Sequence, residues 1–376
     1  MFLKLGLIAF GGPAAHVGLM EDELVRRRQW LSHEEFLDLL GATNLIPGPN
    51  STEMAIHVGN LHAGWPGLIV AGVCFIAPAA LIVTGIAWAY TRYGGLPELA
   101  GFLYGVKPVI IAVVLQALWS LGRKAVKTWP MAIIAVATAL LNYFGVNELA
   151  LLFGVGAVVG LGRAIALRRS QSGMRCLVPL LGLANLSGIP GTAVAASAAA
   201  APFSLSALFL FFLKTGSVLF GSGYVLLAFL RADLVERWHW LSQNQLLDAV
   251  AVGQVTPGPL FTTATFIGYI LGGPMAAFLA TVGIFLPAFV LVALSGPLIP
   301  RVRRSPVAGA VLDGVNVAAL ALMAVVTVQL SVAALVDWPT VLLAIAAAGL
   351  LIRYRVNSAW LVLAGAGLGL LRFLVW

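Results

Sequence analysis

The chain has 376 residues, of which 61% are hydrophobic and 10% are charged, and its mean hydropathy is +1.00. This composition leaves too little polar surface to cover a soluble fold, so it predicts a polytopic membrane protein. In such a protein a net charge of +8 usually reflects basic cytoplasmic loops, which argues against a nucleic-acid partner. The two cysteines, Cys74 and Cys176, predict neither a disulfide framework nor a metal site. We expect no cofactor.

The chain contains an internal repeat with a constant offset of 210 residues, the distance from Phe2 to Phe212. The pattern FLKxGxxxFG begins at both of these residues, and Pro-Gly-Pro occurs at 47–49 and again at 257–259. A Trp-Leu-Ser triplet precedes Pro-Gly-Pro in each half. We therefore predict two homologous halves joined by a linker rich in Gly, Ala, Ser and Pro. The three parts are 1–167, 168–204 and 205–376.

Each half contains six apolar segments, counted at about 20 residues per membrane span. In chain order they are 2–20, 33–62, 65–91, 101–122, 129–145 and 147–167, then 205–230, 243–270, 274–299, 307–333, 338–352 and 357–375. Helices are expected, because backbone polar groups in lipid must be satisfied within the segment and no strand alternation is present. The predicted fold class is an all-α polytopic membrane protein.

The basic loops indicate that the two halves have opposite orientations in the membrane. They follow the first, fourth and sixth segments of the first half, but the third and fifth segments of the second half. Lysine and arginine stay cytoplasmic, so this flip predicts inverted repeats, in which a transported substrate binds near the midplane. If the segments broken by Pro-Gly-Pro dip in and return, the fold has about 10 transmembrane helices and two re-entrant hairpins, with both chain ends outside. The alternative is 13 spans, six in each half and one at 177–201.

Pro-Gly-Pro is the strongest local motif, within NLIPGPNSTE at Asn44–Glu53 and QVTPGPLFT at Gln254–Thr262. Two prolines around a glycine cannot continue a helix, but a new helix can start at the second proline. Its free N–H groups and positive dipole end would then form an anion site inside the protein. The alternative is that the motif only turns a hairpin. The substrate-binding candidates are Asn44, Pro47, Gly48, Pro49, Asn50, Ser51, Thr52, Gln254, Pro257, Gly258, Pro259 and Thr262.

Three lysines within apolar segments are further candidates for binding an anion: Lys4, Lys107 and Lys214. A lysine near the bilayer centre costs about 2.5–3.5 kcal/mol, so its presence suggests a function. The alternatives are a snorkelling Lys4 and an interfacial Lys107. Four acids are candidates for proton coupling, although exposed or first-turn positions would also explain them: Asp38, Glu53, Asp248 and Asp313. The histidines show no ligand spacing, and we expect neither a metal site nor a catalytic group.

Taken together, FLKLGLIAFGGPAAH, the WLS triplet followed by Phe36-Leu-Asp38, NLIPGPNSTEMA, and the second-half FLKTGSVLFGSGY and QVTPGP resemble the chromate ion transporter family in its long two-domain form. The resemblance covers nearly the whole chain. It implies export of chromate, a tetrahedral dianion similar to sulfate, across the bacterial inner (plasma) membrane. The residues at the family's motif positions are Lys4, Gly11, Gly12, Pro13, His16, Asn44, Pro47, Gly48, Pro49 and Asn50.

The function we predict is therefore a membrane transporter, not an enzyme, that exports chromate and gives chromate resistance. An inside-negative potential would drive two negative charges outward with about 4.6 kcal/mol per 100 mV, and proton coupling is a further option. The alternatives are a transporter or exchanger of sulfate or another oxyanion, a passive anion channel, and an intramembrane enzyme acting on lipid phosphate. The expected partners are the oxyanion and membrane lipid, without nucleic acid, and a homodimer is left open.

Overall fold

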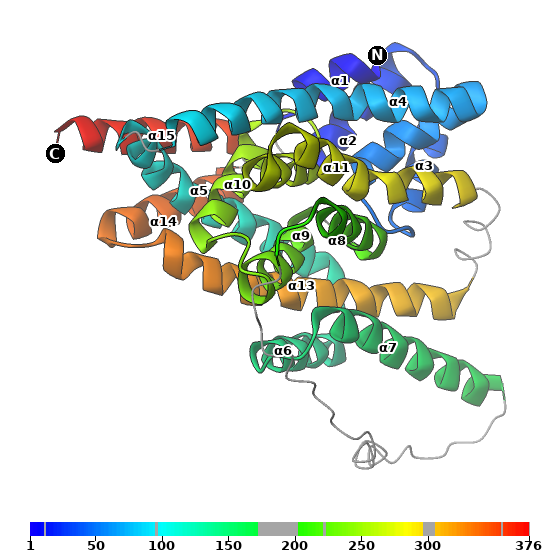
Figure 1. The fold of residues 1–376 in the computed structure, drawn as a ribbon. Helices are drawn as coiled ribbons and strands as arrows, with labels where there is room; N and C mark the ends of the chain where they lie inside the picture. Colours follow the sequence, from blue (N-terminus) through cyan, green and yellow to red (C-terminus); the bar gives the residue numbers. More distant parts are fainter. Residues whose placement is uncertain are drawn as a thin grey trace.

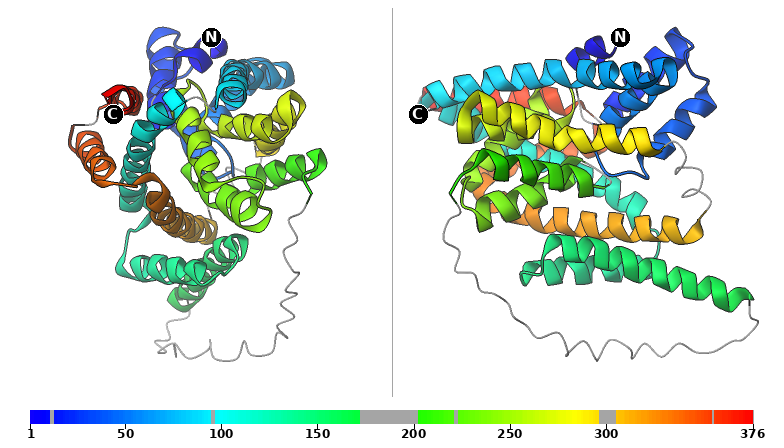
Figure 2. Two further views of the ribbon diagram at one scale, coloured as in Figure 1. Left: turned by 60° about the vertical axis from the view of Figure 1, so that its left-hand side comes forward. Right: turned by 45° about the vertical axis from the view of Figure 1, so that its right-hand side comes forward.

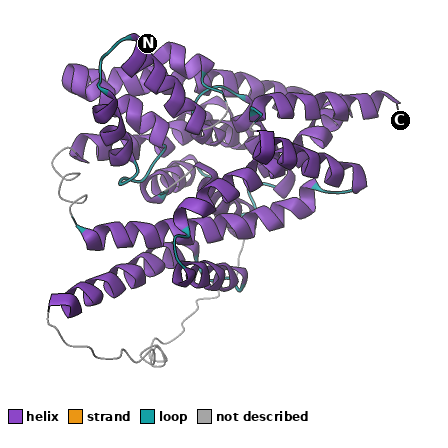
Figure 3. Cartoon of the chain, turned by 180° about the vertical axis from the view of Figure 1, so that it is seen from behind, coloured by secondary structure: helices purple, strands orange, loops and turns teal. Residues whose placement is uncertain are grey.

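The computed structural model describes residues 1–10, 13–94, 97–171, 202–220, 223–295, 305–354 and 356–375. Within these ranges the chain forms helices and no strand, as Figure 3 shows, which confirms the all-α fold class. The elements of the first half are α1 (Phe2–Ile8), α2 (Pro13–Glu21), η1 (Asp22–Arg27), α3 (His33–Thr43), α4 (Asn50–Tyr93), α5 (Pro97–Ala125), α6 (Trp129–Tyr143) and α7 (Glu148–Gln171). Those of the second half are α8 (Leu205–Val218), η3 (Gly223–Val225), α9 (Leu226–Phe229), η4 (Leu230–Arg237), α10 (Gln243–Val255), η5 (Leu260–Thr262), α11 (Thr263–Ser295), α13 (Pro306–Ala334), α14 (Trp338–Tyr354) and α15 (Ser358–Val375).

The first apolar segment of the second half is a helical hairpin and not a single span. Phe203, just before α8, contacts Trp240, just after η4, with ring centroids 5.2 Å apart. Further in, the rings of Phe211 and Trp238 lie 5.6 Å apart. Residues this far apart in sequence meet only if the chain reverses between them. The hairpin consists of α8 on one side and η3, α9 and η4 on the other.

The first half begins with the same hairpin. Lys4 Nζ on α1 lies 3.8 Å from a carboxylate oxygen of Glu23 on η1, and the helix that ends at Ile8 restarts at Pro13. Proline cannot donate the hydrogen bond that would continue a helix, so the chain can change direction there. The expectation that 2–20 and 205–230 are single spans therefore differs from the structure, in which both segments turn back.

The second segment of each half also folds back, as expected for a re-entrant hairpin. Helix α4 begins at Asn50, directly after Pro-Gly-Pro, as predicted. It kinks at Ala63 and Gly64, and α11 kinks in the same way at Gly272 and Gly273. We call the parts before these kinks, 50–62 and 263–271, the short arms. The short arms pack against the long parts that follow.

Glycines allow this close return. A Cβ atom on Gly59 of the first short arm would clash with the carbonyl oxygen of Gly67, and one on Gly268 would lie 2.5 Å from the carbonyl oxygen of Ala276. Gly64 has a φ of +58° and Gly273 one of +72°, values that side chains rarely tolerate. Each half thus opens with two hairpins, the second of which has Pro-Gly-Pro at its tip.

Long apolar helices surround the hairpins. Within the described residues, five helices are long and apolar enough to cross a membrane: those at Asn50–Tyr93, Glu98–Ala125, Glu148–Leu167, Leu260–Ser295 and Pro306–Ala334. Helices α6, α8, α14 and α15 are apolar but shorter. The two halves exchange neighbours, because α5 packs on α14 and α15 while α13 packs on α6 and α7, as seen in Figure 1. This exchange makes the two halves one body.

The long helices follow these hairpins, namely α4, α5 and α7 in the first half and α11 and α13 in the second. In the right-hand view of Figure 2, α7 ends at the right of the molecule, whereas α8 begins at the left. The end of the first half and the start of the second thus lie at opposite ends of the molecule. The count of five spans per half, with both chain ends outside, stays a prediction. Most of the expected linker, residues 172–201, lies outside the described residues.

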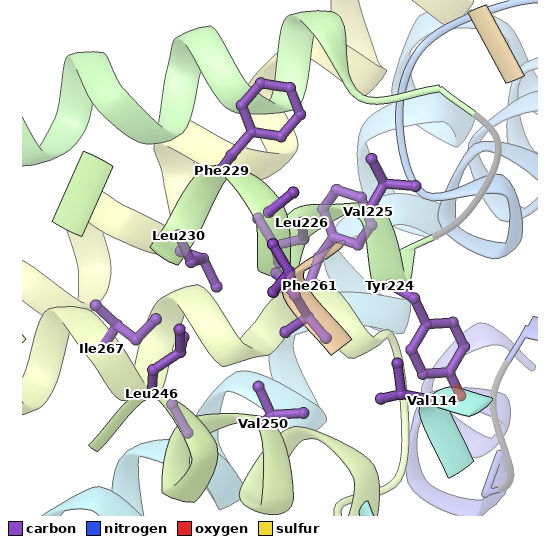
Figure 4. Packing of buried hydrophobic residues seen from close by; sticks show 14 of the residues in the cluster. Val114, Tyr224, Val225, Leu226, Phe229, Leu230, Leu246, Val250, Phe261 and Ile267 are labelled. Carbon is purple, nitrogen blue, oxygen red and sulfur yellow. The ribbon is translucent and has the colours of Figure 1, made fainter. Parts of the chain in front are cut away.

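The hairpins of the second half are held by an apolar core. Tyr224, Leu226 and Phe229 of the first hairpin lie within the same buried cluster as Phe261 and Ile267 of the second, as Figure 4 shows. All five side chains are at most 7% exposed. This packing fixes the tip of one hairpin beside the tip of the other.

Candidate functional site

The hairpin tips of the two halves are joined by a reciprocal pair of backbone hydrogen bonds. Gly48 N donates to the carbonyl oxygen of Leu219 at 2.8 Å, and Gly258 N donates to the carbonyl oxygen of Ala9 at 2.9 Å. Gly48 and Gly258 are repeat mates, as are Ala9 and Leu219. The Pro-Gly-Pro turn of each half thus bonds to the break in the first hairpin of the other half. We call this arrangement the interlocked turns.

Only glycine fits the centre of these turns. Gly48 has a φ of +142° and Gly258 one of +92°, both outside the range that L side chains normally adopt. A Cβ atom on Gly258 would lie 2.6 Å from Ala79 Cβ and 3.2 Å from the carbonyl oxygen of Gly6. A Cβ atom on Gly48 would clash with the carboxylate of Glu53. The turns are therefore tightly enclosed.

Gly6, in the FLKxGxxxFG motif, and its mate Gly216 bring the first hairpins close to the long helices. A Cβ atom on Gly6 would lie 2.5 Å from the carbonyl oxygen of Phe75 on α4, and one on Gly216 would clash with the carbonyl oxygen of Ile284 on α11. Pro13 begins α2, whereas Gly11 and Gly12 lie outside the described residues.

Two helix N-termini begin at the interlocked turns, one at Asn50 and one at Leu260. A helix N-terminus presents free N–H groups and a positive partial charge, which suits an anion. The prolines and glycines on either side are mostly buried, with Pro47 half-buried. The structure thus brings the two Pro-Gly-Pro motifs to one place, at the boundary between the halves.

The amide side chains at this place are not equivalent. Asn44 is exposed and accepts a 2.7 Å hydrogen bond from Asn50 Nδ2. Its repeat mate Gln254 is only 5% exposed and accepts a 3.5 Å hydrogen bond from the hydroxyl of Tyr224. Among the described residues, Gln254 Nε2 has no hydrogen-bond partner. A buried amide donor without a partner is available to a ligand.

The hydroxyl groups of the site also differ between the two halves. Ser51 Oγ lies 3.3 Å from His16 Nδ1, so His16 belongs to the site although its spacing predicted no ligand role. Thr52 is fully buried, and its hydroxyl has no partner within the described part of the chain. The hydroxyl of its mate Thr262 donates a 2.9 Å bond to the carbonyl oxygen of Pro259. The first half therefore provides the free hydroxyl, whereas the second half provides the free amide.

Lys4 and Lys214 each pair with an acid of their own hairpin. Lys4 Nζ lies 3.8 Å from Glu23, and Lys214 Nζ lies 2.5 Å from Asp233. Their side chains are 56% and 37% exposed. Glu23 and Asp233 were missed by the sequence analysis, although they are separated by the repeat offset of 210 residues. Their match across the repeat was the signal that could have found them.

Lys107 and Asp248 form an ion pair between the two halves, at 3.1 Å. The side chains are 16% and 5% exposed, and the hydroxyl of Tyr90 donates a 2.8 Å bond to the other carboxylate oxygen of Asp248. Tyr90 and Asp248 line an apolar cavity of about 590 Å³ together with residues of α4, α5, α10 and α15. This cluster is separate from the interlocked turns.

The remaining acidic candidates are dispersed. Asp38 lies on an exposed face of α3, and Asp313 bonds to Lys127 at 2.8 Å. Glu53 is fully buried and lies against Gly48. Of the four acids, Glu53 alone is in contact with the interlocked turns in the described structure.

Comparison with known proteins identifies the family. Residues 1–161 and 206–370 match the family described as chromate transporter. The chain belongs to the chromate transporter family. A chromate transport protein of Cupriavidus metallidurans is 33% identical over 374 residues, covering 98% of this chain and 90% of that protein. A probable chromate transport protein of Synechococcus elongatus is 33% identical, covering 92% and 87%. A chromate transport protein of Pseudomonas aeruginosa is 32% identical, covering 99% and 91%.

Membership of this family, together with the apolar helices, makes the chain a multi-pass membrane protein and a transporter rather than an enzyme. The gap between the two matched ranges contains the expected linker 168–204. No solved structure matches the chain.

Proposed function

We propose that this chromate transporter exports chromate from the cytoplasm across the bacterial inner membrane, and that the anion binds at the interlocked turns. The observation that carries the proposal is the pair of bonds from Gly48 to Leu219 and from Gly258 to Ala9. They bring two helix N-termini from opposite halves to one enclosed place. The names of the relatives support chromate as the substrate.

The groups at the turns suit a tetrahedral dianion. Removing such an ion from water is costly unless fixed donors replace the water. The N–H groups that begin α4 and η5 act as donors of this kind, as do the free Gln254 Nε2 and the hydroxyl of Thr52. Asn44, Asn50, Ser51 and Thr262 add polar side chains around them. Neutral donors hold the anion without trapping it as tightly as clustered arginines would.

Lys4 and Lys214 attract the anion on either side of the turns. Each lies five residues before the carbonyl that accepts the bond from Pro-Gly-Pro, or about 7.5 Å along a helix. Because the halves are inverted, Lys4 lies toward one membrane face and Lys214 toward the other. Their pairing with Glu23 and Asp233 keeps each lysine near its hairpin when no anion is present.

Alternating access follows from the inverted hairpins. The Gly48–Leu219 bond closes one side of the site, and the Gly258–Ala9 bond closes the other. Breaking one bond while keeping the other opens the site to a single face, which is what a carrier requires. An inside-negative potential then drives export, with about 2.3 kcal/mol per 100 mV for each net negative charge that moves outward.

Counterflow in proteoliposomes tests this function. The purified protein is reconstituted with internal chromate, and uptake of labelled sulfate or chromate is measured. We expect saturable uptake that internal chromate stimulates, and stronger thermal stabilisation by chromate than by molybdate or phosphate. Equal or stronger stabilisation by sulfate would make sulfate the substrate. Uptake that neither saturates nor responds to internal anion would indicate a channel.

A further inference from the structure

We propose that Glu53 carries one proton with each chromate dianion, so that one net negative charge crosses the membrane per cycle. This inference rests on the proposed function, and it names the coupling ion of the same site. It assigns to Glu53 a role separate from that of the groups that hold the anion. Lys4, Lys214 and the helix N-termini attract the anion, whereas Glu53 sets the charge that moves with it.

The surroundings of Glu53 carry the inference. Its side chain is 0% exposed, and neither carboxylate oxygen has a hydrogen-bond partner in the described parts of the chain. The carboxyl group lies against Gly48, because a Cβ atom there would clash with Glu53 Oε1. An ionised carboxylate at this position would lose its hydrating water without gaining a hydrogen bond or a counter-ion, which is costly. The neutral, protonated form therefore fits the structure.

In the part of the chain that the structure describes, the elements packed against the first short arm supply no cation that pairs with Glu53. On α2, His16 is directed to Ser51, and on α1, Lys4 pairs with Glu23. Helix α11 has no acidic or basic side chain from Thr263 to Ser295.

The acids on the other two neighbouring helices are separate from Glu53. On α10, Asp248 pairs with Lys107. On α3, Asp38 is on an exposed face and has contacts of its own. A proton from solution is thus the charge that can neutralise Glu53.

His57 offers a route for this proton. It follows Glu53 by four residues on the same short arm, so the two side chains share one face of the helix. It is 6% exposed, and its Nε2 has no partner among the described residues. A proton can pass between the two side chains as the hairpin moves.

The second half has no such pair, although its backbone is the same. Thr263 replaces Glu53, and its hydroxyl donates a 2.8 Å bond to the carbonyl oxygen of Leu260. Ile267 replaces His57. The hydroxyl of Thr263 is thus satisfied internally, whereas the carboxylate of Glu53 has no partner among the described residues. This asymmetry limits the coupling to one proton per cycle.

Electrostatics decide the direction of coupling. A dianion at the interlocked turns and an ionised Glu53 repel each other, whereas a protonated Glu53 does not. Proton binding therefore strengthens chromate binding, and by reciprocity chromate binding strengthens proton binding. Ligands that bind together move together, so the loaded carrier takes up two negative charges and one positive charge. The proton returns to solution when chromate leaves.

The zero-flux potential of reconstituted protein tests the inference. Chromate flux is measured at a fixed chromate gradient under mildly alkaline conditions, where free chromate is a dianion, with the membrane potential set by potassium and valinomycin. Because one net charge moves in the wild type and two move in Glu53→Gln, we expect the wild-type potential to be about twice that of the variant. A pH gradient should shift the potential of the wild type only. Glu34→Gln, an exposed acid on α3, is the matched control and should behave as wild type.

Counterflow separates this inference from the proposed function. Glu53→Gln should retain chromate–sulfate counterflow, because the neutral amide mimics the protonated acid, and Glu53→Thr, which copies the second half, provides a second neutral variant. If the zero-flux potential of the wild type does not change with the pH gradient, or changes with a sodium gradient instead, the assignment of the proton to Glu53 is overturned. The proposed export of chromate would still stand. Absence of counterflow in the wild type would overturn the proposed function itself.

Discussion

Gly48 in the first half donates its backbone N–H to the carbonyl oxygen of Leu219 in the second half, at 2.8 Å. The repeat supplies the same bond again from Gly258 to Ala9. Each Pro-Gly-Pro turn is therefore a contact between halves as well as a local break in a helix. Movement of one half against the other therefore has to stretch or break at least one of these two bonds.

Replacing Gly258 by alanine should damage both stability and transport. The φ of +92° is costly for any residue with a Cβ atom, by about 1–3 kcal/mol, and the added methyl group would press on Ala79. We expect a lower melting temperature and at least a tenfold loss of chromate flux. The control is Gly309→Ala, where no atom lies within 4 Å of the added Cβ. If Gly258→Ala transports at the wild-type rate, the interlocked turns are not part of the transport path.

Removing the charge of Lys214 should reduce chromate export more than it reduces folding. In Lys214→Met the acid Asp233 keeps its 2.6 Å bond to Arg237, so we expect normal amounts of folded protein and at least a tenfold loss of export. Lys4→Met should have the same effect. Lys214→Arg should retain part of the flux, because the planar guanidinium keeps the charge but alters the fit.

The double variant Lys214→Met with Asp233→Asn tests whether Lys214 acts only on Asp233. If the lysine attracts the anion, the double variant should transport no better than Lys214→Met. If the double variant exports chromate normally, the role of Lys214 is to neutralise Asp233. Lys107 then becomes the next candidate for anion binding.

Breaking the ion pair between Lys107 and Asp248 should destabilise the protein. Lys107→Met leaves a buried carboxylate that keeps its hydrogen bond from Tyr90 but loses its cation, and we expect a loss of about 3 kcal/mol. Adding Asp248→Asn should recover most of this loss, which thermal unfolding of the three variants in detergent would measure. Additive losses in the double variant would show that the pair has no coupling energy.

The chain ends should label from opposite faces of the membrane. Lys4 of the first hairpin pairs with Glu23, close to the basic residues Arg26–Arg28, so we expect the N-terminal end on the cytoplasmic face. Helix α15 leads away from the basic Arg353, so we expect the C-terminal end outside. In a cysteine-free background, Leu3→Cys should react with an impermeant reagent from the cytoplasmic side and Leu371→Cys from the outside. Labelling of both variants from the outside would contradict this expectation and would support five spans per half.

Several features of the fold could be predicted from local chemistry in the sequence. The two halves follow from their common offset, and the restart of α4 at Asn50 follows from the prolines beside it. Ser32 and Ser242 end the two Trp-Leu-Ser triplets, and both form capping boxes with the residue three positions later. In each case the cause lies within a few residues, because backbone restriction and capping are short-range effects.

The tertiary structure alone decided where the chain goes after each break. The glycines near residues 11 and 221 weaken a helix there, but a straight span, a bent span and a hairpin are all compatible with them. The choice depends on contacts such as Phe203 with Trp240 and Gly48 with Leu219. These join residues far apart in the chain, and their free energy comes from packing and hydrogen bonds that exist only once both segments are in place. For the same reason, the acid that pairs with Lys107 lies on a helix of the other half. Glu53, by contrast, has no hydrogen-bond partner for its carboxylate among the described residues.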